Sequence, residues 1–104
     1  MGFNMQKLMQ QAQKMQRDMA KVQEDLGNMQ FEGKAGGGMV TAVCNGNSEL
    51  LGIRIDPQVL DPDDVEMLED MVLAAVREAI AASKEAAAQA MGKITGGAGL
   101  PGMF

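Results

Sequence analysis

The sequence predicts an α+β fold in which a helix, a three-stranded antiparallel meander and a second helix follow one another (α-β-β-β-α). Apolar side chains repeat at helical intervals in residues 5–29 and again in 62–91, and short β-prone runs alternate with glycine-rich turns in residues 30–56. The length of 104 residues suits one small domain. We expect this domain over residues 1–94 and a flexible glycine-rich tail over 95–104.

The first helix is predicted over residues 4–27. Asn4 is a favourable N-cap, Gly27 is favourable just past a helix end, and nearly every residue between them is a strong helix former. The apolar side chains, which we call the seam, hold an unbroken a/d heptad pattern: Met5, Leu8, Ala12, Met15, Met19, Val22, Leu26 and Met29. At about 1.5 Å per residue this helix is roughly 35 Å long. We therefore expect a second helix, from this chain or another, along the seam.

Three strands are predicted where β-prone runs are separated by turn residues. The glycines 36–38 follow the first run, and Asn45-Gly46-Asn47 follows the second. The second turn can centre on Asn45-Gly46 or on Gly46-Asn47. The prediction is an antiparallel meander with strands at about residues 30–35, 39–45 and 48–56.

The two faces of this sheet differ. Alternation gives one face, the expected core face, the side chains of Val40, Ala42, Cys44, Leu51, Ile53 and Ile55. The other face carries Met39, Val43 and Leu50, which is more apolar surface than a solvated face needs. We expect these three residues, with Leu8 and Met15 of the seam, to contact a second copy of the chain.

The second helix is predicted over residues 62–91. Asp61 is the expected N-cap and Pro62 the first helical residue, and either Gly92 or Gly96 ends the helix. Its buried stripe should consist of Val65, Leu68, Val72, Ala75, Val76, Ala79, Ile80 and Ser83.

Enzymatic chemistry is poorly supported by the composition. The chain has no histidine, its single cysteine, Cys44, is expected to be a buried small hydrophobe, and no serine or lysine stands in a nucleophile setting. The stretch GKAGGG lacks the Lys-Ser/Thr ending of a phosphate loop. Methionine at heptad positions favours packing over soft-metal binding. We predict no catalytic residue, cofactor or metal.

The charges predict a basic arm on an acidic body. The net charge is −5, yet the cations of residues 1–23 face only Asp18, whereas residues 55–104 hold nine carboxylates against three cations. No segment has the length of a membrane span and no signal peptide begins the chain, so we expect a cytoplasmic protein with no membrane partner.

The lysines of the arm recur every seven residues. If Met5 is position a, Lys7, Lys14 and Lys21 occupy position c and Arg17 position f, and we expect all four to point almost directly away from the seam. Spacing alone favours a solvated exterior. The single sign of the charges, which are interspersed with glutamines, favours contact with a polyanion.

The chain resembles the YbaB/EbfC family of bacterial nucleoid-associated DNA-binding proteins. The likeness covers essentially the whole chain and rests on LMQQAQKMQRDMAKVQEDL, on GKAGGGMVTAVCNG leading into IRIDPQVLDPDDVEMLEDMVLAA, and on ITGGAGLPGMF. It implies a homodimer with projecting helical arms around double-stranded DNA, limited sequence selectivity, a role in organising the nucleoid and influencing transcription, and no enzymatic activity. Thr41 stands where members often carry lysine, and Arg77 where they often carry asparagine.

We therefore predict that Lys7, Lys14, Arg17 and Lys21 of each arm contact DNA phosphates, with Lys34 and Arg54 as secondary contacts on the sheet. The expected location is the nucleoid, within the cytoplasm. An alternative from another class is a coiled-coil interaction module, in which the seam pairs with a helix of a replication or recombination protein. In that case partner binding depends on the side chains of the seam and does not depend on the lysines.

Overall fold

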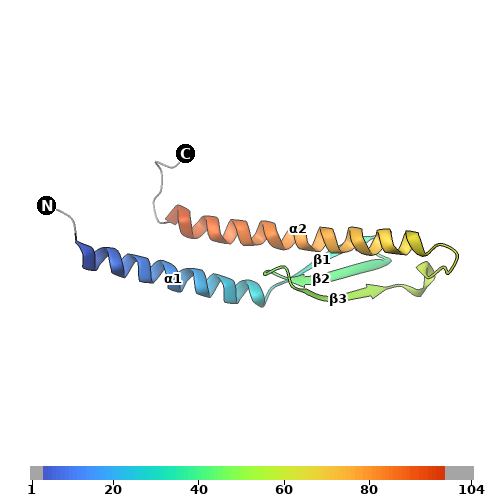
Figure 1. Ribbon diagram of the computed structural model, residues 1–104, viewed down its shortest axis with the longest axis horizontal. Helices are drawn as coiled ribbons and strands as arrows, with labels where there is room; N and C mark the ends of the chain where they lie inside the picture. The colour runs from blue at the N-terminus through green and yellow to red at the C-terminus, as the bar shows by residue number, and fades with distance from the viewer. Residues whose placement is uncertain (1–3, 98–104) are drawn as a thin grey trace.

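The computed structural model describes residues 4–97. The predicted fold class is confirmed, with the elements in the order α1 (Met5–Gly27), β1 (Gln30–Ala35), β2 (Val40–Asn45), β3 (Leu50–Ile55), the short 3-10 helix η1 (Pro57–Val59) and α2 (Val65–Gly97) (Figure 1). Of the predicted tail, residues 95–97 belong to α2, and residues 98–104 lie outside the described residues.

The molecule is a rod rather than a globule. Its extents are 75 × 27 × 16 Å and its radius of gyration is 20.2 Å, whereas a compact domain of this length has a radius of about 13 Å. Figure 1 shows the reason: α2 runs along the sheet and then continues beside α1, which projects from the end of the sheet. The rod therefore consists of a body, made of the sheet and the first part of α2, and an arm, made of α1 and the last turns of α2.

The core lies between α2 and strands β1 and β2 of the antiparallel sheet, whose strand order is β1-β2-β3. Its fully buried side chains are Val40, Ala42, Cys44, Ala75 and Ala79. Cys44 is buried as predicted, and its Sγ donates to the backbone oxygen of Ala79 at 3.2 Å. The body therefore combines small side chains with close approach between helix and sheet.

Gly33 permits that close approach. Its register partner is Ala42, and a Cβ atom at position 33 would collide with the backbone oxygen of Ala75 and the backbone nitrogen of Ala79. Glycine here is a packing requirement, because α2 rests directly on the backbone of β1.

Strand β3 is less buried than predicted. Leu51 and Ile53, expected in the core, are 54% and 42% exposed. The expectation was wrong for both because α2 lies over β1 and β2 and leaves β3 at the edge of the sheet. The placement of Leu50 on the same face as Val43 was also wrong, since a register shift between Val43 and Cys44 pairs Leu50 with Cys44.

The β2–β3 turn is longer than either predicted two-residue turn. The backbone nitrogen of Asn45 donates to the oxygen of Glu49 at 3.0 Å, and the Oδ1 atom of Asn45 accepts from the backbone nitrogens of Asn47 and Glu49, each at 3.0 Å. Ser48 adopts a positive φ of 63°. The Asn45 side chain thus organises a wider loop, and β3 begins at Leu50 instead of residue 48.

Helix α2 is shifted towards the C-terminus relative to its predicted bounds. Asp61 is not its N-cap: the Oδ1 atom of Asp61 accepts from the backbone nitrogen of Asp63 at 2.9 Å in a preceding turn, and Oδ1 of Asp64 accepts from that of Met67 at 3.2 Å. Val65 is exposed, so the buried stripe begins at Leu68. The helix also passes through Gly92, because its last turns lie against α1.

Candidate nucleic-acid interface

Helix α1 is attached to the body at its C-terminal end. Within α1 as the structure describes it, Leu26 is the single buried residue, at 4% exposure. The backbone nitrogen of Gly46 donates to the oxygen of Leu26 at 2.8 Å, and Nδ2 of Asn47 donates to the oxygen of Gln23 at 3.4 Å. A Cβ atom at position 46 would lie 2.7 Å from that of Leu26, so glycine is required at this joint.

The free end of α1 begins with the predicted N-cap. Oδ1 of Asn4 accepts from the backbone nitrogens of Gln6 and Lys7 at 3.0 and 3.2 Å. The first turn of α1 contains no acidic residue. The exposed Lys7 therefore adds its charge to the partial positive charge of the helix N-terminus, which makes the tip of the arm favourable for an anion.

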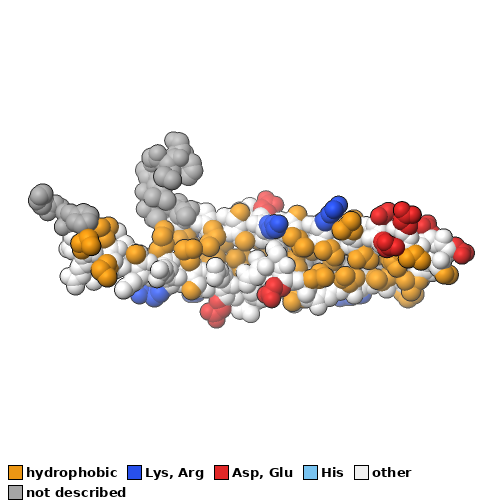
Figure 2. Space-filling view, viewed as in Figure 1, with side chains coloured by type: hydrophobic (Ala, Val, Ile, Leu, Met, Phe, Trp, Pro, Cys, Tyr) orange, Lys and Arg blue, Asp and Glu red, His pale blue; other side chains and the backbone are white. Residues whose placement is uncertain are grey.

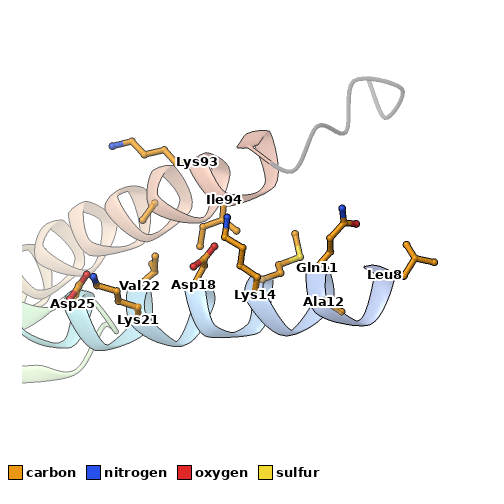
Figure 3. A pocket seen from close by; sticks show the side chains of 12 residues that line it. Leu8, Gln11, Ala12, Lys14, Asp18, Lys21, Val22, Asp25, Lys93 and Ile94 are labelled. Carbon is orange, nitrogen blue, oxygen red and sulfur yellow. The ribbon is translucent and has the colours of Figure 1, made fainter. Parts of the chain in front are cut away.

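The predicted direction of the lysines is wrong for two of them. Lys14 and Lys21 are exposed but line the groove between α1 and α2, together with Asp18 and Asp25 (Figure 3). At about 100° per residue, position c lies roughly 120° around the helix from the seam rather than opposite to it, and α2 passes on that side.

The four cations of α1 therefore have different electrostatic surroundings. Lys14 has Asp18 four residues on, and Lys21 has Asp25 four residues on, spacings at which helical side chains interact. Neither Lys7 nor Arg17 has a carboxylate three or four residues away, and both are exposed. Lys7 and Arg17 are consequently the cations best placed to contact an external polyanion.

The two sheet cations share a row that sequence reasoning did not identify. Lys34 pairs with Thr41, and Thr41 pairs with Arg54, so the three side chains lie side by side across the strands. Their row alternates with the buried row of Ala42, and it therefore lies on the face opposite α2. The two registers, one set by the glycine turn and the other by the wider β2–β3 turn, were the signals that could have revealed it.

The structure does not bring the predicted interface residues into one patch. Met39 and Val43 are half-buried on the sheet, Leu50 is exposed on β3, Leu8 is exposed on α1, and Met15 is half-buried in the groove. The residues missed were Leu51 and Ile53, which join Leu50 to give β3 a run of exposed apolar side chains.

Acidic side chains gather at the end of the rod where α2 begins (Figure 2). The exposed carboxylates of this region are Asp61, Asp63, Asp64, Glu66, Glu69 and Asp70. This acidic end lies far from the α1 N-terminus along the 75 Å axis. A polyanion is thus attracted to one end of the molecule and repelled by the other.

Among residues 4–97, no group of three or more His, Cys, Asp or Glu side chains is placed to hold a metal ion. Within that range, neither α1 nor α2 is sufficiently long and apolar to cross a bilayer.

Known proteins support the interpretation of this geometry. The chain is 53% identical to a nucleoid-associated protein of Pelotomaculum thermopropionicum, covering 100% of this chain and 99% of that one. It is 55% identical to a nucleoid-associated protein of Ruminiclostridium cellulolyticum, with 99% and 90% covered. The crystal structure of the uncharacterized protein HP0035 from Helicobacter pylori has the same fold, with a TM-score of 0.81, 22% identity, and 89% of this chain and 98% of that chain covered.

The family comparison agrees with these relatives. The model of the YbaB/EbfC DNA-binding family matches residues 1–98. This confirms the resemblance inferred from the glycine-rich turn, the Ile-Asp-Pro segment and the heptad helix, and the family is one of DNA-binding proteins rather than enzymes. The chain belongs to the YbaB/EbfC DNA-binding family.

Proposed function

We propose that this chain binds double-stranded DNA as a homodimer whose α1 arms contact the phosphate backbone. Lys7 and Arg17 are the main contacts, and the other predicted cations, which are Lys14, Lys21, Lys34 and Arg54, contribute less. The protein organises the nucleoid, within the cytoplasm, and influences transcription there. The names of its relatives, which are nucleoid-associated proteins, support the association with the nucleoid.

The observation that carries the proposal is the unshielded charge of the arm. Lys7 and Arg17 are exposed on a helix of 23 residues that is anchored at one end. The concentrated carboxylates lie at the other end of the rod, where they do not weaken the attraction. Flexible cations on a helix exterior suit phosphate oxygens and carry no base information, so sequence selectivity should be limited.

The exposed strand β3 supports a homodimer. Leu50, Leu51 and Ile53 are each more than one-third exposed, although they are large apolar residues in a strand. A second copy packed on β3 removes this surface from water. Val43 lies on the opposite face of the sheet from Leu50 and Ile53, so the proposed interface is centred on β3, and the dimer presents two arms to one duplex.

Electrophoretic mobility shifts across a salt series test the proposal. If all four α1 cations of both arms contact phosphates, the slope of log affinity against log salt is about −7; if Lys7 and Arg17 alone do so, it is about −4. The combined variant Lys7→Glu and Arg17→Glu should lose DNA binding. A DNA affinity that does not change with salt concentration, or that is retained by this variant, contradicts the proposal.

The matched control reverses the same kinds of charge on α2. Arg77→Glu with Lys84→Glu changes the net charge by the same amount, at exposed positions outside the arm. This control should retain most of the affinity and the full salt slope. The mass of each variant in solution, measured by light scattering, establishes that charge reversal has not dissociated the dimer.

A second candidate function is a coiled-coil interaction module for a replication or recombination protein. It is favoured by the exposure of Leu8 and Met19 on the seam of α1. Under this hypothesis, Leu8→Glu with Met15→Glu abolishes partner binding, and Lys7→Glu with Arg17→Glu leaves it intact. If the chain instead binds DNA through the arm, Lys7→Glu with Arg17→Glu abolishes DNA binding and Leu8→Glu with Met15→Glu leaves it intact. Measuring both variants therefore separates the two functions.

A further inference from the structure

A groove runs between α1 and the last turns of α2, with a volume of about 890 Å³. None of the twelve residues that line it is buried, although half of them are apolar: Leu8, Ala12, Met15, Val22, Ala90 and Ile94. In the body, by contrast, Val40 and Ala42 are fully buried beneath α2. The two helices of the arm therefore leave an apolar surface accessible to water.

The arm is a single layer of helices. The shortest extent of the whole molecule is 16 Å, and one helix with its side chains is already about 10–12 Å across. Figure 1 shows α1 and α2 side by side in this layer. Because a core forms between two packed layers, a two-helix arm has no interior of its own. A second pair of helices laid on the groove supplies one, as in a four-helix bundle.

Four charged side chains form a line along the α1 side of the groove: Lys14, Asp18, Lys21 and Asp25 (Figure 3). At about 100° per residue, the four positions fall within about 60° of the helix circumference, so they share one flank. All four side chains are exposed. Their signs alternate, and they are spaced by four, three and four residues. We call this set the charge line.

Pairing within α1 explains the order of these charges less well. An acid four residues before a base is the more favourable order in a helix, because it agrees with the helix dipole. In the charge line the order is reversed, since Lys14 precedes Asp18 and Lys21 precedes Asp25. The line is therefore better suited to charges that come from outside its own helix.

The charge line is complementary to itself. Reversing its direction leaves the spacing unchanged and inverts every sign. A copy of α1 that runs in the opposite direction therefore places a lysine opposite an aspartate at all four positions, whereas a parallel copy in register places like charges opposite each other. Opposed like charges across an interface are unfavourable.

We propose that the arms of two copies of this chain pair in opposite directions, with α1 of each copy docked in the groove of the other. Lys14 then lies opposite Asp25 of the second copy, and Asp18 lies opposite its Lys21. The same approach removes the apolar floors of both grooves from water. We call this contact the arm pair.

The arm pair goes beyond the proposed function and does not depend on it. Lys7 and Arg17 are not part of the charge line, and the exposed strand β3 belongs to the body. A chain with two different two-fold contacts, one at β3 and one at the arm, forms assemblies larger than a dimer. The arm pair thus links dimers to one another while Lys7 and Arg17 contact DNA.

Sedimentation equilibrium over a concentration series without DNA tests the arm pair. Lys14→Asp with Lys21→Asp gives a line of four acids, and Asp18→Lys with Asp25→Lys gives a line of four bases. Each variant alone should associate through its arms at least about tenfold more weakly than the unchanged chain, because four attractive pairs become repulsive. An equimolar mixture of the two should recover the association of the unchanged chain. A mixture that associates no more tightly than either variant alone, or variants that associate like the unchanged chain, overturns the proposal.

The matched control exchanges all four charges at once. Lys14→Asp, Asp18→Lys, Lys21→Asp and Asp25→Lys together preserve the net charge and the alternation, so this chain should associate with itself as tightly as the unchanged chain. Circular dichroism establishes that α1 remains helical in every variant. Weak association of the helical control contradicts pairing by alternating charge. Strand β3 is unchanged in all these chains, so a dimer formed there persists when the arm pair is lost.

A spin label gives the direction of the pair. In a Cys44→Ala background, a nitroxide at Gln11→Cys lies opposite residue 28 of the second copy when Lys14 lies opposite Asp25. In mixtures with isotope-labelled chains that carry no nitroxide, the amide resonances of residues 23–28 of the isotope-labelled chains should broaden. Those of residues 7–15, about 20 Å or more away along α1, should remain sharp. Broadening confined to residues 7–15, or no broadening in α1, overturns the proposal.

Discussion

The arm and the body of this protein bury apolar side chains to very different extents. In the body, Val40, Ala42 and Cys44 are fully covered by α2. The arm carries an unbroken apolar heptad, yet Leu26 is the single buried residue of α1 in the described structure. Periodicity therefore shows where a helix can pack, and the placement of neighbouring elements decides whether it does. The body serves as a scaffold that presents an accessible helix.

The two regions also differ in charge. The tip of the arm combines a helix N-terminus with Lys7, whereas the beginning of α2 concentrates carboxylates (Figure 2). In both places the helix dipole acts on the charges nearby: the acids at the start of α2 are stabilised by it, and an external anion is attracted to the start of α1. The same physical feature thus has a structural use in the body and a binding use in the arm.

The largest expected effect lies in the body, at Gly33. Gly33→Val places a side chain into the backbone of α2 and should destabilise the fold by about 4 kcal/mol or more, as overpacking and helix displacement combine. Urea denaturation monitored by circular dichroism measures it. Gly92→Val is the control, because a Cβ atom at position 92 meets open space and glycine and valine differ little in helix propensity, and its free energy of unfolding should change by less than about 0.5 kcal/mol. Similar losses at both positions would contradict the packing described here.

The next effect lies at the joint between the two regions. Leu26→Ala removes the buried contact of the arm and should cost about 3 kcal/mol, at the level of a buried leucine truncation. The loss should appear as faster hydrogen exchange throughout α1, with β2 still protected. Met9→Ala, at an exposed position of the same helix, should change the free energy by less than about 0.5 kcal/mol. Concerted loss of protection in β2 and α1 would show that arm and body unfold as one unit.

A smaller effect lies at the tip of the arm. Asn4→Ala removes the side-chain oxygen that accepts from Gln6 and Lys7, and should cost about 1 kcal/mol of local helix stability. Exchange of the first-turn amides measures it. Asn4→Ser preserves a capping oxygen and should restore protection; if serine and alanine behave alike, the cap does not stabilise the tip.

The smallest effect on stability is expected at Lys14 and Lys21, which have a carboxylate four residues on. Lys14→Ala with Lys21→Ala removes two exposed cations that stand four residues before Asp18 and Asp25, and should change the free energy of unfolding by less than about 1 kcal/mol. In DNA binding, this variant should reduce the salt slope less than Lys7→Ala with Arg17→Ala, which is expected to reduce it by about 4 per dimer. An equal reduction by the two pairs would show that Asp18 and Asp25 do not shield Lys14 and Lys21.

Local signals predicted much of the fold. Asn4 caps the N-terminus of α1 as predicted, because capping acts within a few residues of the chain; the C-cap is Asn28, and Gly27, predicted just past the helix, is its last residue. The three glycines 36–38 adopt φ values of 62°, 68° and 93°, which explains why the turn between β1 and β2 was recognisable. The prediction of Asp61 as the N-cap of α2 was wrong because aspartate side chains cap turns as readily as helices. The side chain of Asp64 caps α2 instead.

The candidate site was less predictable. All six predicted cations are exposed, but their surroundings depended on distant parts of the chain. Lys14 and Lys21 lie at the groove because α2 continues past Gly92 to meet α1. Lys34 and Arg54 share a row because of the register across Thr41. Neither relation is contained in the spacing of the residues along one helix or strand.

By itself, the sequence determined the order of the elements, the heptad of α1, the burial of Cys44 and the separation of basic and acidic segments, because each depends on residue type and short-range periodicity. The tertiary structure alone decided which apolar residues are covered. Helix α2 lies over β1 and β2, leaves Leu51 and Ile53 exposed, and ends before Leu8. Coverage is set by where a neighbouring element passes and stops, a long-range property that no local pattern encodes.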